Sequence, residues 1–395
     1  MARLIYFLFF YFYSSICLKA QNQEITRIPF LLNDDHIIIQ LRINNSTPLN
    51  FMFDSGAGGI LINKSFSDSI GLKAASERVN TGAVGTHAVS ILKGNTITIG
   101  DAQINNVNMM RDDKDFEELN GGVEIAGIIG FHILSRFVVK IDYDTSELIF
   151  YNRINFSYEG NGVIVPIVLT YNLPIVISTL VINDDTEIEG FFLVDTGARS
   201  YLIITSPTVN KYNMIDKIDD YYVLRTDVGS SGKKANVLFG KIKTLDFAEY
   251  KFNSVPTVLS QADEGVLSFE GIDGIIGNKI LKRFNIFFDY QRGFIYLEQN
   301  GNIDKKLFVN VSGLSIIFKK GVPIIKDIIE RSPATRAGLK NGDEIISING
   351  QFVKDMNQDL IREAFKSEEG IKLELVIKRG EAKLKYTEII LKALI

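Results

Sequence analysis

Short apolar runs rich in β-branched and aromatic residues follow one another along most of the chain. The runs at 36–43, 163–169 and 175–182 are typical of β-strands. The Gly, Asn and Asp residues between such runs favour turns. Helices are expected in this part only as short pieces, at 131–136 and 279–283. The pattern therefore predicts a mainly β structure.

The last part of the chain, 305–395, mixes helical and strand patterns. Ser332-Pro333 is a helix start, with Ser at the N-cap and Pro in the first turn. The runs at 344–349 and 371–378 indicate strands, and 355–366 indicates an amphipathic helix. The apolar positions of that helix are Met356, Leu360, Ile361 and Phe365. These elements predict a separate α+β domain.

The mainly β part contains an internal repeat. Gly127–Tyr143 (GIIGFHILSRFVVKIDY) and Gly274–Tyr290 (GIIGNKILKRFNIFFDY) are identical at ten of seventeen positions. Upstream, Phe51–Ile62 resembles Phe191–Ile203 in the same order. Two copies of a unit of about 140 residues indicate a duplicated domain rather than a solenoid. The predicted boundaries are 25–155 for the first lobe and 160–298 for the second.

Each copy carries an aspartate directly after an apolar strand, in Asp54-Ser55-Gly56 and Asp195-Thr196-Gly197. A single triplet of this kind is explained by an Asx turn. Two triplets at the same place in a repeat predict that pseudo-two-fold pairing brings the aspartates together. Two adjacent carboxylates cannot both ionise easily, so they share one proton and supply both an acid and a base.

These residues resemble the retropepsin-like aspartic peptidases, in the bacterial form that joins two lobes in one chain. The resemblance covers about residues 28–298 and rests on D-S/T-G-A and on the later I-I-G at 128–130 and 275–277. It implies two retropepsin- or pepsin-like β lobes around one active site, in a single chain, with Asp54 and Asp195 as the catalytic pair. The residues implied to support the catalytic loops are Ser55, Gly56, Ala57, Thr196, Gly197 and Ala198. Ser55 and Thr196 would hydrogen-bond across the lobes.

The resemblance also implies flaps, glycine-bearing hairpins that close over the substrate. The candidate flap residues are Gly82, Ala83, Val84 and Gly85 in the first lobe and Val228, Gly229 and Ser230 in the second. The alternative is a plain surface hairpin. Arg199 departs from the repeat, because the first lobe has Gly58 at that place. This arginine either lowers the pKa values of the aspartates or points to solvent.

The C-terminal domain resembles PDZ domains of the bacterial type, through 332–339 and 341–350. The implied peptide-binding residues are Gly313, Leu314, Ser315 and Ile316. A PDZ domain takes a peptide as an added strand and holds its terminal carboxylate with backbone amides. The implied partner is therefore a C-terminal peptide. The alternative is a domain that serves only as a packing lid.

Composition excludes several other chemistries. The formal net charge of −4 argues against a nucleic-acid partner. Cys17 is the one cysteine, so disulfides and cysteine-ligated metals are excluded from the body of the protein. His36, His87 and His132 are scattered without metal-ligand spacing. We therefore expect no metal and no cofactor.

The N-terminal residues 1–20 have the pattern of a secretory signal peptide. Arg3 precedes an apolar stretch at 4–18, and Ala20 precedes a polar run. The stretch is short for a membrane span, although a retained anchor is the alternative reading. We expect an exported protein, periplasmic, attached to the cell envelope or secreted, with no integral membrane span after cleavage.

The sequence thus predicts an aspartic endopeptidase that hydrolyses exported polypeptides, with a PDZ domain that recruits substrate or gates access. A non-catalytic peptide-binding module on a peptidase-like scaffold is the alternative, and a non-peptide hydrolase on the same scaffold is a third.

Overall fold

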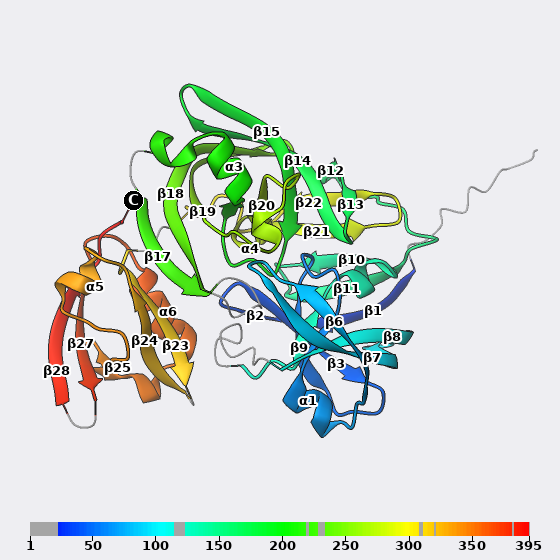
Figure 1. The fold of residues 1–395 in the computed structure, drawn as a ribbon, viewed down its shortest axis with the longest axis horizontal. Helices are drawn as coiled ribbons and strands as arrows, with labels where there is room; N and C mark the ends of the chain where they lie inside the picture. The colour runs from blue at the N-terminus through cyan, green and yellow to red at the C-terminus, as the bar shows by residue number, and fades with distance from the viewer. Residues whose placement is uncertain are drawn as a thin grey trace, which may run out of the picture.

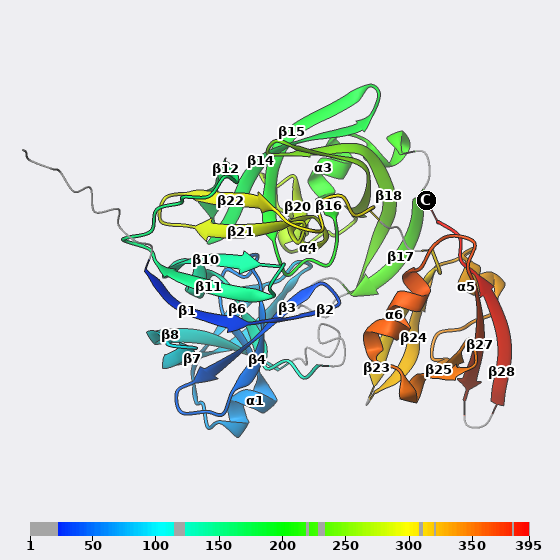
Figure 2. The ribbon, with the colours of Figure 1, turned by 180° about the vertical axis from the view of Figure 1, so that it is seen from behind.

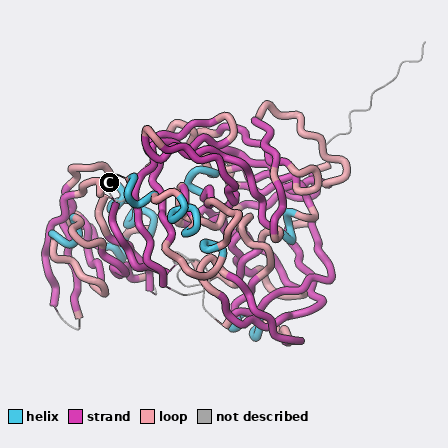
Figure 3. Tube along the Cα trace, turned by 45° about the horizontal axis from the view of Figure 1, so that its top comes forward, coloured by secondary structure: helices cyan, strands magenta, loops and turns pink. Residues whose placement is uncertain are grey.

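The structure is a computed structural model that describes residues 23–113, 123–218, 221–227, 234–307, 311–319, 321–380 and 383–394. The expected signal peptide, 1–20, lies outside the described residues. Strands dominate the described part and the helices are short (Figure 3). The mainly β fold class, with two similar lobes and a C-terminal α+β domain, is confirmed.

Each lobe is built on an eight-stranded sheet, and the two sheets have the same strand order. In the first lobe this order is β2 (Leu31–Asn33), β3 (His36–Ile43), β4 (Leu49–Phe53), β9 (Gly127–Ile129), β5 (Leu61–Asn63), β8 (Ala102–Asp112), β7 (Thr86–Ile99) and β6 (Ala74–Thr81). In the second it is β13 (Val168–Thr170), β14 (Leu173–Asn183), β15 (Thr186–Asp195), β20 (Gly274–Gly277), β16 (Leu202–Ile204), β19 (Tyr250–Ser260), β18 (Lys234–Phe247) and β17 (Tyr221–Asp227). The repeat seen in the sequence is therefore a repeat of topology.

A third sheet of six strands joins the lobes (Figure 2). Its order is β1 (Glu24–Pro29), β11 (Glu147–Asn152), β10 (Phe137–Asp142), β21 (Phe284–Asp289), β22 (Phe294–Gln299) and β12 (Val163–Pro166). At its centre Lys140 pairs with Phe287, which is the same position in the other copy of the repeat. The pseudo-two-fold axis therefore passes between these two residues.

The strand predicted at 163–169 is interrupted. The chain runs in the joining sheet as β12, leaves it at the buried Ile167, and enters the second lobe as β13. The Ile167 amide bonds to the Gly293 carbonyl at 2.9 Å. The first lobe has the same bend at Phe30, whose amide donates to the Ser146 carbonyl. A change of sheet needs a bend, which the periodicity of the apolar residues does not show.

The lobes share one apolar core that continues across the joining sheet. Phe51, Phe53, Phe192, Phe284 and Phe288 are among its fully buried side chains. Burial of each such side chain stabilises the fold by roughly 1.5–3 kcal/mol. Short helices cap the strands: α1 (Lys64–Ser69), α2 (Phe131–Leu134), α3 (Ser206–Lys211), the 3₁₀ turn η1 (Met214–Lys217) and α4 (Asn278–Leu281).

A two-residue turn connects the first two strands of each lobe sheet. Asp34 and Asp35 have φ values of 46° and 67°, and Tyr171 and Asn172 have 52° and 67°. Two successive positive φ values are those of a type I′ hairpin turn. Each turn projects toward the opposite lobe, which places its side chains beside the other lobe's catalytic loop.

The C-terminal domain has its own core and its own sheet. The sheet order is β23 (Leu314–Lys319), β24 (Val322–Ile328), β25 (Glu344–Ile348), β27 (Lys372–Arg379) and β28 (Lys383–Ile390), with β26 (Gln351–Phe352) paired to β25. The helices are α5 (Pro333–Arg336), the 3₁₀ turn η4 (Val353–Asp355) and α6 (Gln358–Lys366). The Ser332 hydroxyl caps α5 by accepting the Thr335 amide.

Of the four apolar positions predicted for the last helix, two are buried in the helix as expected, one precedes it, and one is exposed. Ile361 and Phe365 are buried, and Met356 packs against the same core. Leu360 is 53% exposed, so its assignment to the buried face was wrong. The helix begins only at Gln358, so Met356 precedes it, and Leu360 lies on its exposed side.

The C-terminal domain lies beside the two lobes, with α6, β23 and β24 on its near side and β27 and β28 on its far side (Figure 1). Strand β23 is one edge of the described sheet, and β28 is the other. Within the same part of the chain, no helix has the length and apolar character needed to cross a membrane.

Candidate active site

Asp54 and Asp195 occupy the same place in the two lobes. Asp54 follows β4, and its amide bonds to the Ile129 carbonyl of the parallel strand β9 at 2.9 Å. Asp195 ends β15, which pairs in parallel with β20. Each I-I-G motif therefore forms the strand beside its aspartate, and this neighbour fixes where the catalytic loop leaves the sheet.

Ser55 and Thr196 lock the two loops together. The Ser55 amide donates to the Thr196 hydroxyl oxygen at 2.9 Å, and the Thr196 amide donates to the Ser55 hydroxyl oxygen at 3.0 Å. Each hydroxyl also donates to a carbonyl of the opposite lobe, Ser55 to Val194 and Thr196 to Phe53. Both side chains are fully buried. These four bonds hold the loops at a fixed separation.

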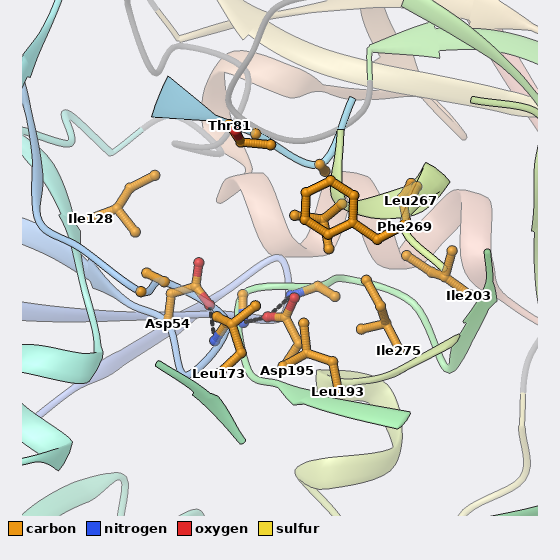
Figure 4. Close-up of a pocket in the computed structure, with 18 of the residues that line it drawn as sticks. Asp54, Thr81, Ile128, Leu173, Leu193, Asp195, Ile203, Leu267, Phe269 and Ile275 are labelled. Carbon is orange, nitrogen blue, oxygen red and sulfur yellow. Dashed lines mark hydrogen bonds between the residues drawn. The ribbon is translucent and has the colours of Figure 1, made fainter. Parts of the chain in front are cut away.

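The two carboxyl groups lie next to each other (Figure 4), and each lies against the glycine of the other lobe's triplet, Asp54 against Gly197 and Asp195 against Gly56. Gly56 donates its amide to the Asp54 carboxylate and Gly197 donates to Asp195, both at 2.7 Å. Ala198 adds a second bond to Asp195 at 3.0 Å. A Cβ added at Gly56 would overlap the Asp195 carboxyl group, so only glycine allows this approach.

Burial determines the protonation of the pair. It raises the pKa of Asp54 well above its ordinary value, and the neighbouring carboxyl group of Asp195 raises it further. Burial also raises the pKa of Asp195, although its hydrogen bonds with Asp54, Gly197 and Ala198 lower that pKa. The carboxyl pair therefore holds one proton to a higher pH than an isolated aspartate, and this titration belongs to the pair.

The carboxyl pair lies on the floor of a cavity of about 1110 Å³. Apolar side chains from both lobes form most of its walls (Figure 4). They include Met52, Leu61, Met110 and Ile128 from the first lobe and Leu173, Leu193, Ile203, Leu267, Phe269 and Ile275 from the second.

The predicted flap of the first lobe is the turn between β6 and β7, and it closes over the cavity. Gly82 and Ala83 line the cavity, and Val84 is buried in an apolar cluster of the second lobe. Gly85 completes the turn by accepting the Gly82 amide at 3.0 Å.

The tip of this flap is docked on the second lobe. The carbonyls of Gly82 and Ala83 accept the amides of Val266 and Leu267, both at 3.0 Å, in the 3₁₀ turn η3 (Val266–Ser268). Gly265 precedes this turn with a φ of 86°, and a Cβ there would meet the Ala83 carbonyl and the Gly85 amide at 2.5 Å. The docking site therefore requires glycine.

Other predicted residues fall in different places. Val228, Gly229 and Ser230, the second flap, lie outside the described residues. Ala57 is buried beside the catalytic loop, and Ala198 packs against the apolar cluster of the second lobe. Arg199 does not simply point to solvent, because it forms an ion pair with Asp34 at 2.6 Å.

The predicted peptide-binding loop of the C-terminal domain leads into the edge strand. Gly313 has a φ of 76°, and its carbonyl accepts the Ile329 amide at 2.8 Å. Leu314 is buried, whereas Ser315 and Ile316 are partly exposed along β23. Helix α6 packs beside this strand, since the Arg362 guanidinium of α6 lies 4.6 Å from the Phe318 ring of β23.

His36 and Lys326 are among the cavity residues that the sequence reasoning missed. His36 is buried, and its Nε2 lies 3.2 Å from the Gly197 carbonyl oxygen. A carbonyl can only accept, so Nε2 is the donor. Lys326 of β24 brings the C-terminal domain to the edge of the same cavity. Neither residue had a signal in the sequence, because His36 contacts a loop 161 residues away and Lys326 belongs to the C-terminal domain.

The remaining acids and histidines have structural contacts. Asp142 and Asp289 close the turns after β10 and β21 by accepting the amides of Thr145 and Arg292. His87 pairs with the buried Asp112 at 2.7 Å. No group of three or more His, Cys, Asp or Glu side chains suited to a metal occurs among the residues that the structure describes.

Comparison with known proteins identifies two domain families in the chain. Residues 39–133 match the family described as aspartyl protease, and residues 298–378 match the PDZ domain. The carboxy-terminal processing protease CtpA of Bacillus subtilis (strain 168) is 24% identical over 140 residues, 35% of this chain and 30% of CtpA. The chain thus covers less than a third of that relative. The aspartic proteinase from Irpex lacteus superposes with a TM-score of 0.44 and 14% identity, over 71% of this chain and 99% of that one.

Proposed function

Because the chain carries an aspartyl protease domain and a PDZ domain, we propose that it is an aspartic endopeptidase whose catalytic pair is Asp54 and Asp195. The observation that carries the proposal is the contact between the two buried carboxyl groups, one from each copy of a repeat. Raised pKa values at such a contact are typical of groups that exchange protons in a reaction.

The geometry supports a mechanism by activated water. One carboxylate of the pair removes a proton from a water molecule as that water attacks the peptide carbonyl. The protonated carboxyl donates its proton to the carbonyl oxygen, and a tetrahedral intermediate forms. The backbone amides of Gly56, Gly197 and Ala198 hold the carboxyl groups in orientation without moving during the reaction.

The substrate in this proposal is an extended polypeptide with apolar residues around the scissile bond. The apolar walls of the cavity support this choice, and the docked flap excludes water from the reacting groups. The PDZ domain binds a peptide beside β23 and either recruits the substrate or gates access. The N-terminal sequence supports an exported enzyme that acts outside the cytoplasm.

A peptide-library digestion between about pH 3 and pH 8 tests the proposal. We expect endoproteolytic cleavage beside apolar residues, with kcat/KM falling as pH rises through the raised pKa of the pair, where the shared proton is lost. Asp54→Asn, with a circular dichroism spectrum equal to that of wild type, is the matched control and should not cleave.

Two results would overturn the assignment. Peptide binding without turnover at any pH indicates a binding module on the same scaffold. Cleavage of esters or other non-peptide bonds, with every peptide left intact, indicates a different hydrolase.

A further inference from the structure

The turn between β2 and β3 of the first lobe contacts the loop of the second lobe that carries Asp195. Asp34 Oδ2 accepts the Arg199 guanidinium at 2.6 Å, four residues after Asp195. The Asp35 carbonyl accepts the Asn278 amide group at 2.7 Å. His36 donates to the Gly197 carbonyl. Asp34 and His36 of one lobe therefore hold the loop that carries Asp195 of the other, and Asp35 between them contacts the start of α4.

The repeat provides a weaker contact in the opposite direction. The equivalent turn of the second lobe contacts the first catalytic loop through Asn172, whose side-chain amide donates to the Gly58 carbonyl at 3.2 Å. That contact is a neutral hydrogen bond without an ion pair. Leu173 occupies the place of His36 in the strand register. Of the two loops, the loop of Asp195 is thus the one that an ion pair holds.

The PDZ domain reaches the same turn. Lys366, in the last turn of α6, forms an ion pair with Asp34 Oδ1 at 3.3 Å, on the carboxylate oxygen that Arg199 does not use. Burial alone would raise the pKa of Asp34, but Arg199, Lys366, Arg362 and Lys279 together hold it well below its ordinary value. Asp34 is therefore a carboxylate shared by cations of two different domains.

We propose that Lys366 of the PDZ domain is a positioning residue for the peptidase, which acts through Asp34 and Arg199 to hold the Asp195 loop. Lys366 binds one oxygen of the Asp34 carboxylate and fixes the other oxygen toward Arg199. The PDZ domain thereby becomes a third support of the active site besides the two lobes. This inference rests on the proposed function, because its catalytic readout is peptide cleavage.

The expected effects follow from the exposure of the partners. The side chains of Asp34, Arg199 and Lys366 are 22%, 40% and 50% exposed. Ion pairs of this exposure contribute at most about 1 kcal/mol, which corresponds to about a fivefold change in rate. The effect should appear in kcat more than in KM, because neither Asp34 nor Lys366 lines the cavity.

The test uses the full chain with Lys366→Gln, Lys366→Arg, Asp34→Asn and the double variant Asp34→Asn/Lys366→Gln, assayed on a short apolar peptide. We expect kcat to fall about threefold in Lys366→Gln, to return to near wild type in Lys366→Arg, and to fall further in Asp34→Asn. The double variant should be no slower than Asp34→Asn, because both changes break the same linkage.

Lys372→Gln is the matched control. Lys372 also forms an ion pair within the PDZ domain, with Glu388 at 2.6 Å, but it lies on β27, away from the lobes (Figure 1). It should leave kcat unchanged. Amide hydrogen exchange of residues 195–200 should quicken in Lys366→Gln and not in Lys372→Gln.

Several results would overturn the proposal. They are an unchanged kcat and exchange rate in Lys366→Gln, an equal effect of Lys372→Gln, no recovery in Lys366→Arg, or independent multiplicative losses in the double variant. If the wild-type chain cleaves nothing, the proposed function fails, but the exchange measurement still decides whether Lys366 holds the loop.

Discussion

The two lobes have the same strand order and the same catalytic triplet, but they differ in what packs behind the triplets. Tyr143 and Tyr290 are equivalent in the repeat, and both are buried. The Tyr143 hydroxyl bonds to the Asn278 side chain at 2.5 Å. The Tyr290 ring lies 6.3 Å from the ring of Phe131, which stands in the place of Asn278, and the Tyr290 hydroxyl has no hydrogen-bond partner in the described structure.

The difference shows where a duplicated domain is free to diverge. The residues that touch the carboxyl groups are the same or nearly the same in both copies, because each must supply one acid in one geometry. The residues one layer behind differ in charge and polarity, as with Phe131 and Asn278, or His36 and Leu173. We infer that the two copies keep similar residues around the carboxyl groups and differ in the residues that pack behind them.

Replacing either aspartate tests whether the two lobes contribute equally to catalysis. Asp54→Asn and Asp195→Asn should each lower kcat by about a thousandfold or more, because each removes one member of an acid–base pair. The losses should be of similar size, measured as initial rates on one peptide. A variant that retains wild-type cleavage would contradict the role of its lobe.

The same variants should change the dependence of stability on pH. The pKa values of Asp54 and Asp195 are raised mainly by burial, so the folded state binds more protons than the unfolded state. The stability that the pair contributes is fully present below about pH 4 and is lost as pH rises through its folded pKa values. Wild-type Tm should therefore fall relative to Asp54→Asn between about pH 4 and pH 7.

The difference between wild type and variant is the quantity to measure. Asp34, Asp35 and Asp142 have lowered pKa values, so their contributions are lost as pH falls and act in the opposite direction. Subtracting the two melting curves removes these shared contributions. A difference in Tm that is constant with pH would contradict the raised pKa values.

Gly265→Ala tests the asymmetric docking of the first flap. The added Cβ would meet the flap backbone in a conformation with positive φ, so the flap should undock, and kcat/KM should fall about tenfold. Gly271→Ala in the same loop is the matched control. Gly271 has a φ of 89° and no atom within 4 Å of the added Cβ, so it brings the same backbone strain without the clash. Equal losses in the two variants would indicate strain alone.

The two tyrosines provide the smallest and most direct comparison. Tyr143→Phe leaves the Asn278 oxygen without this partner, and we expect it to destabilise the protein by about 1–2 kcal/mol. Tyr290→Phe removes a buried hydroxyl that has no partner, so it should be neutral or stabilising by up to about 1 kcal/mol. Urea unfolding at one pH measures both. Equal destabilisation would show that the Tyr290 hydroxyl is satisfied.

The sequence by itself determined the duplication, the β-rich class and the pairing of Asp54 with Asp195. Each of these rests on patterns that repeat along the chain. A repeat of strands and turns must fold twice in the same way, and two copies that share an axis bring equivalent residues together. The PDZ domain was equally visible, because its helix start and turn lie in one continuous stretch.

Only the tertiary structure decided which residues support the aspartates. His36, Asp34 and Lys366 come from a turn and a helix far apart in sequence, and they meet because the lobes and the PDZ domain pack against one another. Hydrophobic periodicity reports which face of a strand is buried, but not which domain covers it. The docking of the flap on Gly265 and the bend at Ile167 depend in the same way on contacts between segments that no local pattern connects.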